Sequence, residues 1–352
     1  MFFTIVGFLS GASYVCPCSP TVGGSKNMCF MDNEAKILTP EQWEKYAPVL
    51  QEMEKYRNLS EEEKEQIILQ IVSAPYIDLM CDWAFKHVFG HDKESLMMLL
   101  NDFLPEKVVD LEYDDKELDL FARDDKLVVM DVVCKTENGR KILVEMQKSE
   151  KKNFRSRMLY YGAGMFYKQL KSGEDYGKLM PVYVICFMNF TLRHQENQLV
   201  YRYEVFEESS HERYEPDKKK EQLLTWIYCE LPRFAGSTGN QLSPVEQWFD
   251  ILQNMRNFAL NPQHVDKRFS GILEACQQNR LPDTEQIQYI RAMISEREKQ
   301  EIAEVYLERG IEQGIEQGKM ETIRRFAAAG ASTELIANAT GMSVEEIEAL
   351  RQ

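Results

Sequence analysis

The spacing of apolar residues divides the chain into a helical first part, a central part with strand-like patterns and a helical last part. Residues 38–72 repeat apolar positions at helical spacing, and Ser60 before three glutamates is typical of a helix N-cap. Residues 82–90 (DWAFKHVFG) and 94–105 (ESLMMLLNDFLP) each place apolar side chains on one helical face. We therefore expect helices over these segments, the last of them ended by Pro105.

From about residue 107 the apolar residues alternate with polar ones or form continuous runs, which is the pattern of strands. Predicted strands cover residues 107–115, 126–135, 140–147, 180–190 and 224–231. Residues 154–170 (FRSRMLYYGAGMFYKQL) are predicted to form a helix between the third and fourth of these strands. This order of elements predicts an α/β fold, with a mixed sheet flanked by helices.

Beyond Pro244 the apolar spacing is helical again, and we expect a helical C-terminal extension. Its charged stretch, residues 284–329, contains RGIEQGIEQGK, with a glycine at every fourth position. Because glycine costs about 1 kcal/mol per site in a helix, the prediction there is a solvated, frayed connector. Residues 330–352 predict a short helical hairpin with Ser332 and Ser343 as N-caps. The C-terminal helices are candidates for a homo-oligomer contact.

These patterns predict five segments. In chain order they are a disordered N-terminal tail (1–40), a helical lead-in (41–75), the α/β domain (76–262), the helical connector (263–329) and the hairpin (330–352). The apolar N-terminal stretch MFFTIVGFLSGASYVCPC lacks the positive residues of a signal peptide and is short for a membrane span. A true start at Met31 is an alternative to a disordered tail.

The amino-acid composition of the chain disfavours several classes of function. The chain has 352 residues, 44% of them apolar, and a formal net charge of −15. This charge argues against a protein that coats nucleic acid over its whole surface, although a local basic patch is compatible with it. The eight cysteines include no CxxC pair, which disfavours a zinc or dithiol redox site and fits a reducing cytoplasm. No segment beyond the N-terminus approaches membrane-spanning length, so we expect a cytoplasmic protein with no membrane partner.

The segment VMDVVCKTENGRKILVEMQ (129–147) carries acids within two apolar strands. Glu145 and Gln147 are two residues apart on one strand, so their side chains share a face. A two-residue turn would place Asp131 on the other face of the sheet. A three-residue loop that ends at a left-handed Gly139 places Asp131 directly opposite Glu145. We predict this second register.

Two opposed carboxylates repel each other by up to about 1 kcal/mol, and a cation between them removes this cost. Mg²⁺ fits, because this hard ion binds one or two carboxylates together with a backbone carbonyl, for which Met146 is positioned. Such an ion activates water and stabilises charge on a phosphoryl group. The alternative is structural, with Asp131 and Glu145 on an exposed strand face and one of them paired with Lys148 or Arg140. The apolar strands favour burial, where unpaired acids are costly.

An Asp, a hairpin and then Glu-x-Gln resembles the core of the PD-(D/E)XK nucleases, in the form found in the recombination-promoting nucleases and PD-(D/E)XK transposases. Further segments resemble that family in the same order: DWAFKHVFG, LLNDFLP, LVEMQ, the helix and strand of residues 154–190, YCELPRF and GIEQGIEQG. The resemblance extends over about residues 76–352. It implies a restriction-endonuclease-like core and metal-dependent endonuclease activity that hydrolyses DNA phosphodiester bonds.

The resemblance also implies roles for individual residues. Asp131, Glu145 and the Met146 carbonyl would bind Mg²⁺, for which Mn²⁺ is a possible substitute. Gln147 takes the position of the lysine in the general pattern and would place the attacking water. A glutamine can position a water but brings no charge. A second hypothesis therefore stays open: a DNA-binding or assembly protein that keeps the nuclease fold but cleaves poorly.

Other residues are candidates around this centre. Asp82 and Glu117 are candidates for a third acid, and the alternative for Asp82 is a role as the N-cap of its helix. The basic segment after the second acidic strand would bind the DNA backbone, with Arg155 and the start of the following helix at the edge of Gln147. Its candidate DNA-binding residues are Lys148, Lys152, Arg155 and Arg157.

Overall fold

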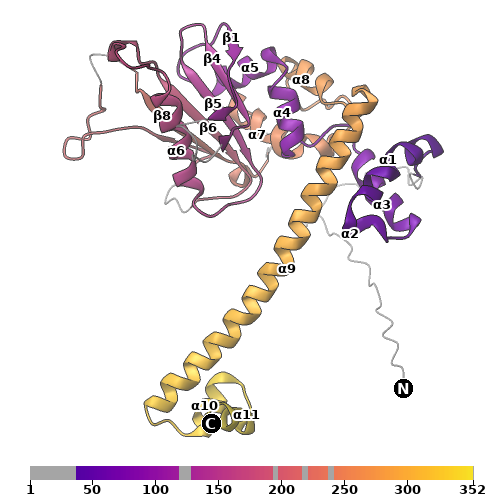
Figure 1. Ribbon diagram of the computed structural model, residues 1–352, viewed down its shortest axis with the longest axis vertical. Helices are drawn as coiled ribbons and strands as arrows, with labels where there is room; N and C mark the ends of the chain where they lie inside the picture. The colour runs from indigo at the N-terminus through magenta and orange to yellow at the C-terminus, as the bar shows by residue number, and fades with distance from the viewer. Residues whose placement is uncertain (1–36, 119–127, 193–196, 216–220, 237–241, 352) are drawn as a thin grey trace, which may run out of the picture. The chain divides into compact units, whose positions relative to one another are not determined.

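The central apolar segments fold into a mixed sheet. The computed structural model describes residues 37–118, 128–192, 197–215, 221–236 and 242–351, and within these ranges six strands form one sheet in the order β1-β4-β5-β6-β8-β7 (Figure 1). The strands of this sheet are β1 (Leu111–Tyr113), β4 (Val132–Thr136), β5 (Lys141–Gln147), β6 (Val182–Met188), β7 (Val200–Tyr203) and β8 (Leu224–Glu230). Strands β5, β6 and β8 run parallel, and the other pairs are antiparallel.

The predicted strands are present, with two differences. The segment predicted as one strand over 126–135 is divided: β3 (Val128–Val129) pairs with β2 (Glu117–Leu118), and only β4 joins the main sheet. The edge strand β7 was not predicted, because its polar and half-buried residues lack a clear alternation. The predicted tail over 1–40 lies largely outside the described residues.

Helices cover both faces of the sheet. The helices before and after it are α1 (Pro40–Glu52), α2 (Glu54–Arg57), α3 (Glu61–Val72), α4 (Asp82–Phe89), α5 (Lys93–Phe103), α7 (Pro244–Asn254), α8 (Ser270–Ala275) and α9 (Asp283–Ala328). Residues from α4, α5, α7 and α9 share one core with one face of the sheet, through side chains such as Phe85, Trp248 and Phe187. The other face packs against α6 (Phe154–Tyr167), through Met158, Met165 and their neighbours (Figure 1).

The turn between β4 and β5 fixes the register of the hairpin. Gly139 is left-handed (φ 82°), and the N–H of Thr136 donates to the carbonyl of Arg140 at 2.9 Å, as the three-residue loop predicts. Val132 is then paired with Val144, so the predicted register, with Asp131 opposite Glu145, is confirmed.

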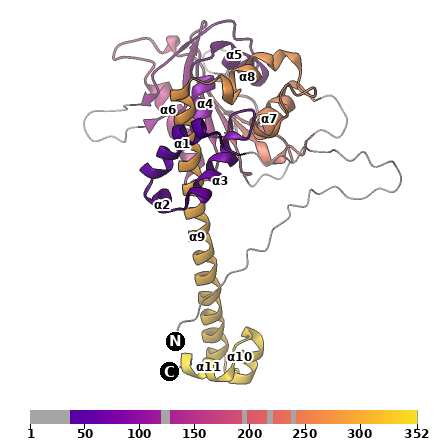
Figure 2. The same ribbon diagram turned by 90° about the vertical axis from the view of Figure 1, so that its right-hand side faces the viewer.

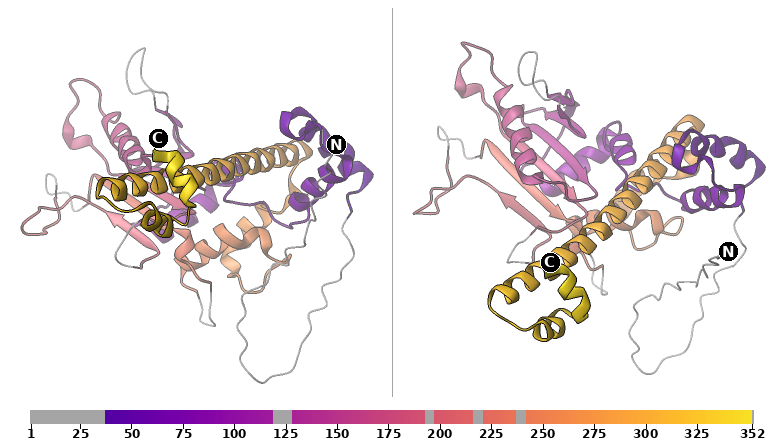
Figure 3. Two further views of the ribbon diagram at one scale, coloured as in Figure 1. Left: turned by 90° about the horizontal axis from the view of Figure 1, so that it is seen from below. Right: turned by 60° about the horizontal axis from the view of Figure 1, so that its bottom comes forward.

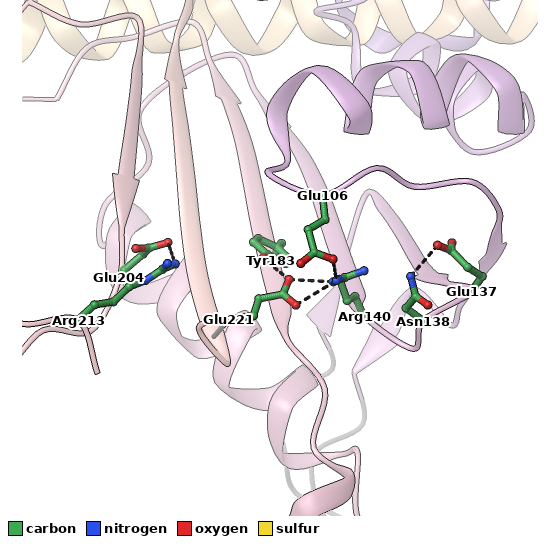
Figure 4. A network of polar contacts seen from close by, with 8 residues as sticks. All are labelled: Glu106, Glu137, Asn138, Arg140, Tyr183, Glu204, Arg213 and Glu221. Atoms are coloured by element: carbon green, nitrogen blue, oxygen red, sulfur yellow. Dashed lines mark hydrogen bonds and ion pairs between the residues drawn. The ribbon is translucent and has the colours of Figure 1, made fainter. Parts of the chain in front are cut away.

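A buried arginine secures the turn end of this hairpin. Arg140 is a buried residue, 8% exposed, and its guanidinium donates to both carboxylate oxygens of Glu221 at 2.8 and 3.1 Å and also pairs with Glu106 (Figure 4). Tyr183 on β6 donates its hydroxyl to Glu221 at 2.6 Å. Two-pronged bonds of this kind restrict orientation, so this network ties the hairpin to the segments that precede β1 and β8.

The N-terminal helices and the last part of the chain meet along α9. Helices α1, α3 and α4 all contact α9, and Figure 2 shows α1 and α3 beside it. Phe269, Ile272 and Cys276 lie beyond the predicted domain boundary at 262, yet they belong to the same core as Trp248. The packing therefore shows no break at that boundary.

The C-terminal residues form the predicted hairpin. Helix α9 continues through the GIEQ repeats instead of fraying, and α10 (Thr333–Thr340) and α11 (Val344–Arg351) follow beside its end (Figure 3). Ser332 caps α10, and the left-handed Gly341 ends it. Ile323, Ile336 and Ile347 form a small core between the three helices. None of the described helices is long and apolar enough to cross a membrane.

Gly162→Ala should destabilise the fold. Helix α6 approaches the sheet closely at Gly162, where an added Cβ would lie 3.1 Å from Val184 and 3.2 Å from the Trp226 indole nitrogen. That nitrogen donates to the Met158 carbonyl, so displacing the ring also weakens a hydrogen bond. We expect a loss of about 1–3 kcal/mol, measured by thermal or urea unfolding.

Gly314→Ala is the matched control. Gly314 is also helical, but an added Cβ there meets no atom within 4 Å, so the higher helix propensity of alanine should leave stability equal or higher. Equal stability of the Gly162→Ala variant and the wild type would contradict the close packing of α6.

Candidate active site

Asp131 and Glu145 lie together at the open end of the β4–β5 hairpin. Their side chains are buried, with 5% and 3% of each residue exposed. The backbone N–H of Asp131 donates to Glu145 Oε1 at 3.2 Å, and the N–H of Met146 donates to Asp131 Oδ2 at 2.9 Å. Carboxylates thus take backbone donors that would otherwise continue the strand ladder, which explains why β4 begins only at Val132.

A lysine that the sequence analysis did not select lies beside Asp131. Lys86 Nζ on α4 is 3.0 Å from Asp131 Oδ1 and 2.8 Å from Asp82 Oδ1. The signal in the sequence was the spacing of Asp82 and Lys86, which places them on one helical face. Asp82 is the first residue of α4 and follows the N-cap position, Cys81, so the alternative N-cap role is not observed.

Gln147 and Arg157 extend the cluster on its other side. Gln147 Nε2 donates to Glu145 Oε2 at 3.0 Å, and Gln147 Oε1 accepts from Arg157 Nη2 at 2.5 Å. The shared strand face of Glu145 and Gln147 predicts their contact. The cation beside Gln147 is Arg157, whereas the guanidinium of Arg155 lies 5.7 Å from the centre of the Tyr203 ring.

The negative charges of the buried acid pair are not fully compensated in the metal-free protein. Burial, and then the charge of Asp131, raises the pKa of Glu145 to about 8. Burial also raises the pKa of Asp131, although Lys86 opposes that effect. Burial alone would lower the pKa of Lys86, but the carboxylates of Asp131 and Asp82 outweigh it and raise this pKa. One lysine therefore does not fully compensate the two buried acids.

The donor set suits a hard divalent cation. The Met146 N–H points toward Asp131, whereas the Gln147 carbonyl accepts from Asn189 on the β6 side at 2.9 Å. Because N–H and C=O of one strand residue point to the same side, the Met146 carbonyl faces the acid pair. Two carboxylates and a carbonyl are typical protein ligands of Mg²⁺, which keeps several waters.

The third-acid candidates do not complete a larger cluster. Asp82 is held by Lys86 and is separated from the acid pair by it. The backbone of Glu117 pairs with Val129 on β3, and its side chain lies outside the described part of the chain. Among the residues that the structure describes, no group of three or more His, Cys, Asp or Glu side chains is arranged to hold a metal.

The candidate DNA-binding residues differ in their exposure to solvent and in their ion pairs within the protein. Lys148 Nζ is 2.7 Å from Glu296 on α9, and that glutamate also accepts the N–H of Asp82. Lys152 and Arg155 are exposed at the start of α6, where residues 150–156 line a surface hollow of about 370 Å³. Lys152 and Arg155 thus face solvent, and Lys148 is engaged within the fold.

Comparison with known families gives a match over most of the chain. Residues 79–307 match the model of the PD-(D/E)XK nuclease family transposase. The chain belongs to this family. No curated protein and no solved structure matches the chain.

Family membership confirms two predictions from the sequence. The family predicted from the hairpin motif is the one matched, and the mixed sheet with flanking helices is the predicted α/β PD-(D/E)XK fold. PD-(D/E)XK nucleases typically use divalent metals and act on DNA, so membership supports a nuclease-like or transposase-like function.

Glu145→Gln should stabilise the metal-free protein at alkaline pH. The pKa of Glu145 is about 8 in the folded state, against 4.5 ordinarily, so folding favours the protonated acid. Stability due to this group is complete below pH 4.5, falls as the pH rises above that value and is lost above a pH of about 8. Relative to the variant, the wild type should lose about 2–3 kcal/mol between about pH 6 and about pH 9.

Urea unfolding in EDTA at several pH values measures this difference. The exposed Glu150 provides the matched control, Glu150→Gln. A stability difference between Glu145→Gln and the wild type that does not change with pH would show that the buried acid is not protonated near neutral pH.

Proposed function

We propose that the protein is a metal-dependent DNA endonuclease that hydrolyses phosphodiester bonds, of the recombination-promoting nuclease type. The observation that carries this proposal is the buried pair of carboxylates, Asp131 and Glu145, set opposite each other by the hairpin register. Family membership supports a nuclease-like reaction, and the raised pKa of Glu145 supports a site that gains from a bound cation.

In this proposal Asp131, Glu145 and the Met146 carbonyl would hold Mg²⁺, for which Mn²⁺ would be a substitute. The bound ion would supply charge stabilisation at the phosphoryl group and activate water. Lys86, which pairs with both Asp131 and Asp82, would compensate the charge of Asp82 beside the ion. Gln147, which donates to Glu145, would place the attacking water.

The DNA backbone would cross the edge of the sheet at the start of α6. Lys152 and Arg155 are exposed there and provide phosphate contacts, together with the N-terminal N–H groups of α6. Lys148 joins them only by exchanging its pair with Glu296. Contacts of this kind are independent of base sequence and weaken with salt.

One observation favours the second candidate function, a DNA-binding or assembly protein with little cleavage. Lys86 already pairs with Asp131, and Gln147 has no charge. A site whose acid is held by an internal cation binds a metal ion less readily. Cleavage in the presence of divalent ions distinguishes the two functions.

Asp131→Asn and Glu145→Gln should each abolish cleavage of supercoiled plasmid. Both substitutions keep the size of the side chain and remove a proposed metal ligand, so we expect at least about a 100-fold loss of rate with Mg²⁺ or Mn²⁺. Agarose gels measure the nicked and linear products over time.

The exposed Glu112 on β1 provides a matched control, Glu112→Gln, which should cut like the wild type. Thermal unfolding must show that all variants are folded. A wild type that cuts no plasmid with either ion would reject the endonuclease and favour the binding protein. Equal cutting by all variants would place the active site elsewhere.

A further inference from the structure

Arg157 carries a positive charge that is not in an ion pair with any carboxylate that the structure describes. Its side chain is partly buried beside the acid pair, and Nη2 donates to the neutral oxygen of Gln147 at 2.5 Å. Its guanidinium lies 5.9 and 6.0 Å from the ring centres of Tyr161 and Phe154. Within the described part of the chain, the Nε of Arg157 is buried without a hydrogen-bond partner.

The other cation at the site differs in this respect. Lys86 shares its charge between Asp82 and Asp131 at 2.8 and 3.0 Å. Arg157 influences Glu145 only at longer range, by opposing the rise of its pKa. A partly buried guanidinium whose N–H groups are not all hydrogen-bonded can bind an anion. The planar arrangement of these N–H groups fits the oxygens of a phosphate.

Gln147 holds this arginine in place. Its amide has two ends with different contacts: Nε2 donates to Glu145 and Oε1 accepts from Arg157. The orientation of the amide is fixed, because Arg157 has no acceptor and the Glu145 carboxylate is the acceptor on the other side. A lysine at this position could donate to Glu145 but could not accept from Arg157.

We propose that Arg157 binds the phosphate under attack and stabilises its growing negative charge, and that Gln147 is a positioning residue for Arg157. This inference rests on the proposed function. In the reaction the water oxygen bonds to phosphorus and one P–O ester bond breaks. One water proton ends on the departing sugar oxygen and the other is released, which leaves a hydroxyl end and a phosphate end.

The first test compares Arg157→Met with the wild type in single-turnover cleavage of a plasmid at saturating protein. We expect a fall in rate of about 100-fold, the size typical of losing one charge-stabilising group. Affinity for a short duplex, measured by fluorescence anisotropy with Ca²⁺ in place of Mg²⁺, should fall only a few-fold. Arg155→Met should instead bind DNA more weakly, with a smaller dependence of the affinity on salt and little change in rate.

Lys168→Met is the charge-matched control. Lys168 is exposed at the far end of the same helix, and its loss should change neither rate nor affinity. Arg157→Lys keeps the charge without the fork and should retain part of the rate. Thermal unfolding of each variant checks that α6 stays folded.

Rescue provides the decisive test. Gln147→Lys places a cation beside Glu145 from the strand, so adding it to Arg157→Met should recover at least about tenfold of the lost rate. Gln147→Lys alone should be slow, because it sets two cations side by side. A role of Arg157 in folding alone predicts no rescue.

The inference is overturned if Arg157→Met cuts at the wild-type rate, or if it loses only affinity, while Asp131→Asn is inactive. In that case the endonuclease proposal stands and the role of Arg157 does not. A wild type that cuts no DNA with any divalent ion overturns both.

Discussion

The register of one antiparallel hairpin determines the candidate site. A shift of one residue would move Asp131 to the opposite face of the sheet, away from Glu145. The three-residue loop with left-handed Gly139 sets the register at one end, where Arg140 secures it. At the other end each acid accepts an N–H from the facing strand. The same hydrogen bonds that end the ladder thus orient the carboxylates.

Charge around the acid pair comes from both layers of the fold. Lys86 belongs to α4, whose apolar residues pack in the core on one side of the sheet, and Arg157 belongs to α6 on the other side. The acids are therefore enclosed by cations from two independent helices. The two cations have different partners. Lys86 can therefore compensate the charge of the acids, while Arg157 is available to bind an anion.

Local pattern was sufficient to predict the acids and their register. Alternation, turn chemistry and the Glu-x-Gln spacing all act over a few residues, and they placed Asp131, Glu145 and Gln147 correctly relative to one another. Lys86 was missed, because its contact with Asp131 depends on where α4 packs against the sheet. The contact of Arg157 with Gln147 depends in the same way on the close approach of α6, which Gly162 permits.

The division of the predicted strand into β3 and β4 at Asp131 also could not be predicted from the apolar pattern. An apolar run gives no sign that a carboxylate will take the next backbone donor. Long-range packing is likewise the reason that residues after 262 could not be assigned to the main core from sequence, although their apolar side chains, such as Phe269, are buried there.

Glu296 gives the last third of the chain a part in building the site. From α9 it accepts the first N–H of α4 and pairs with Lys148, directly after β5. A chain that ended before α9 would leave both groups without this acceptor, next to the helix that supplies Lys86. The start of α9 up to Glu296 is therefore part of the structure that supports the hairpin, whereas the GIEQ repeats lie beyond these two contacts.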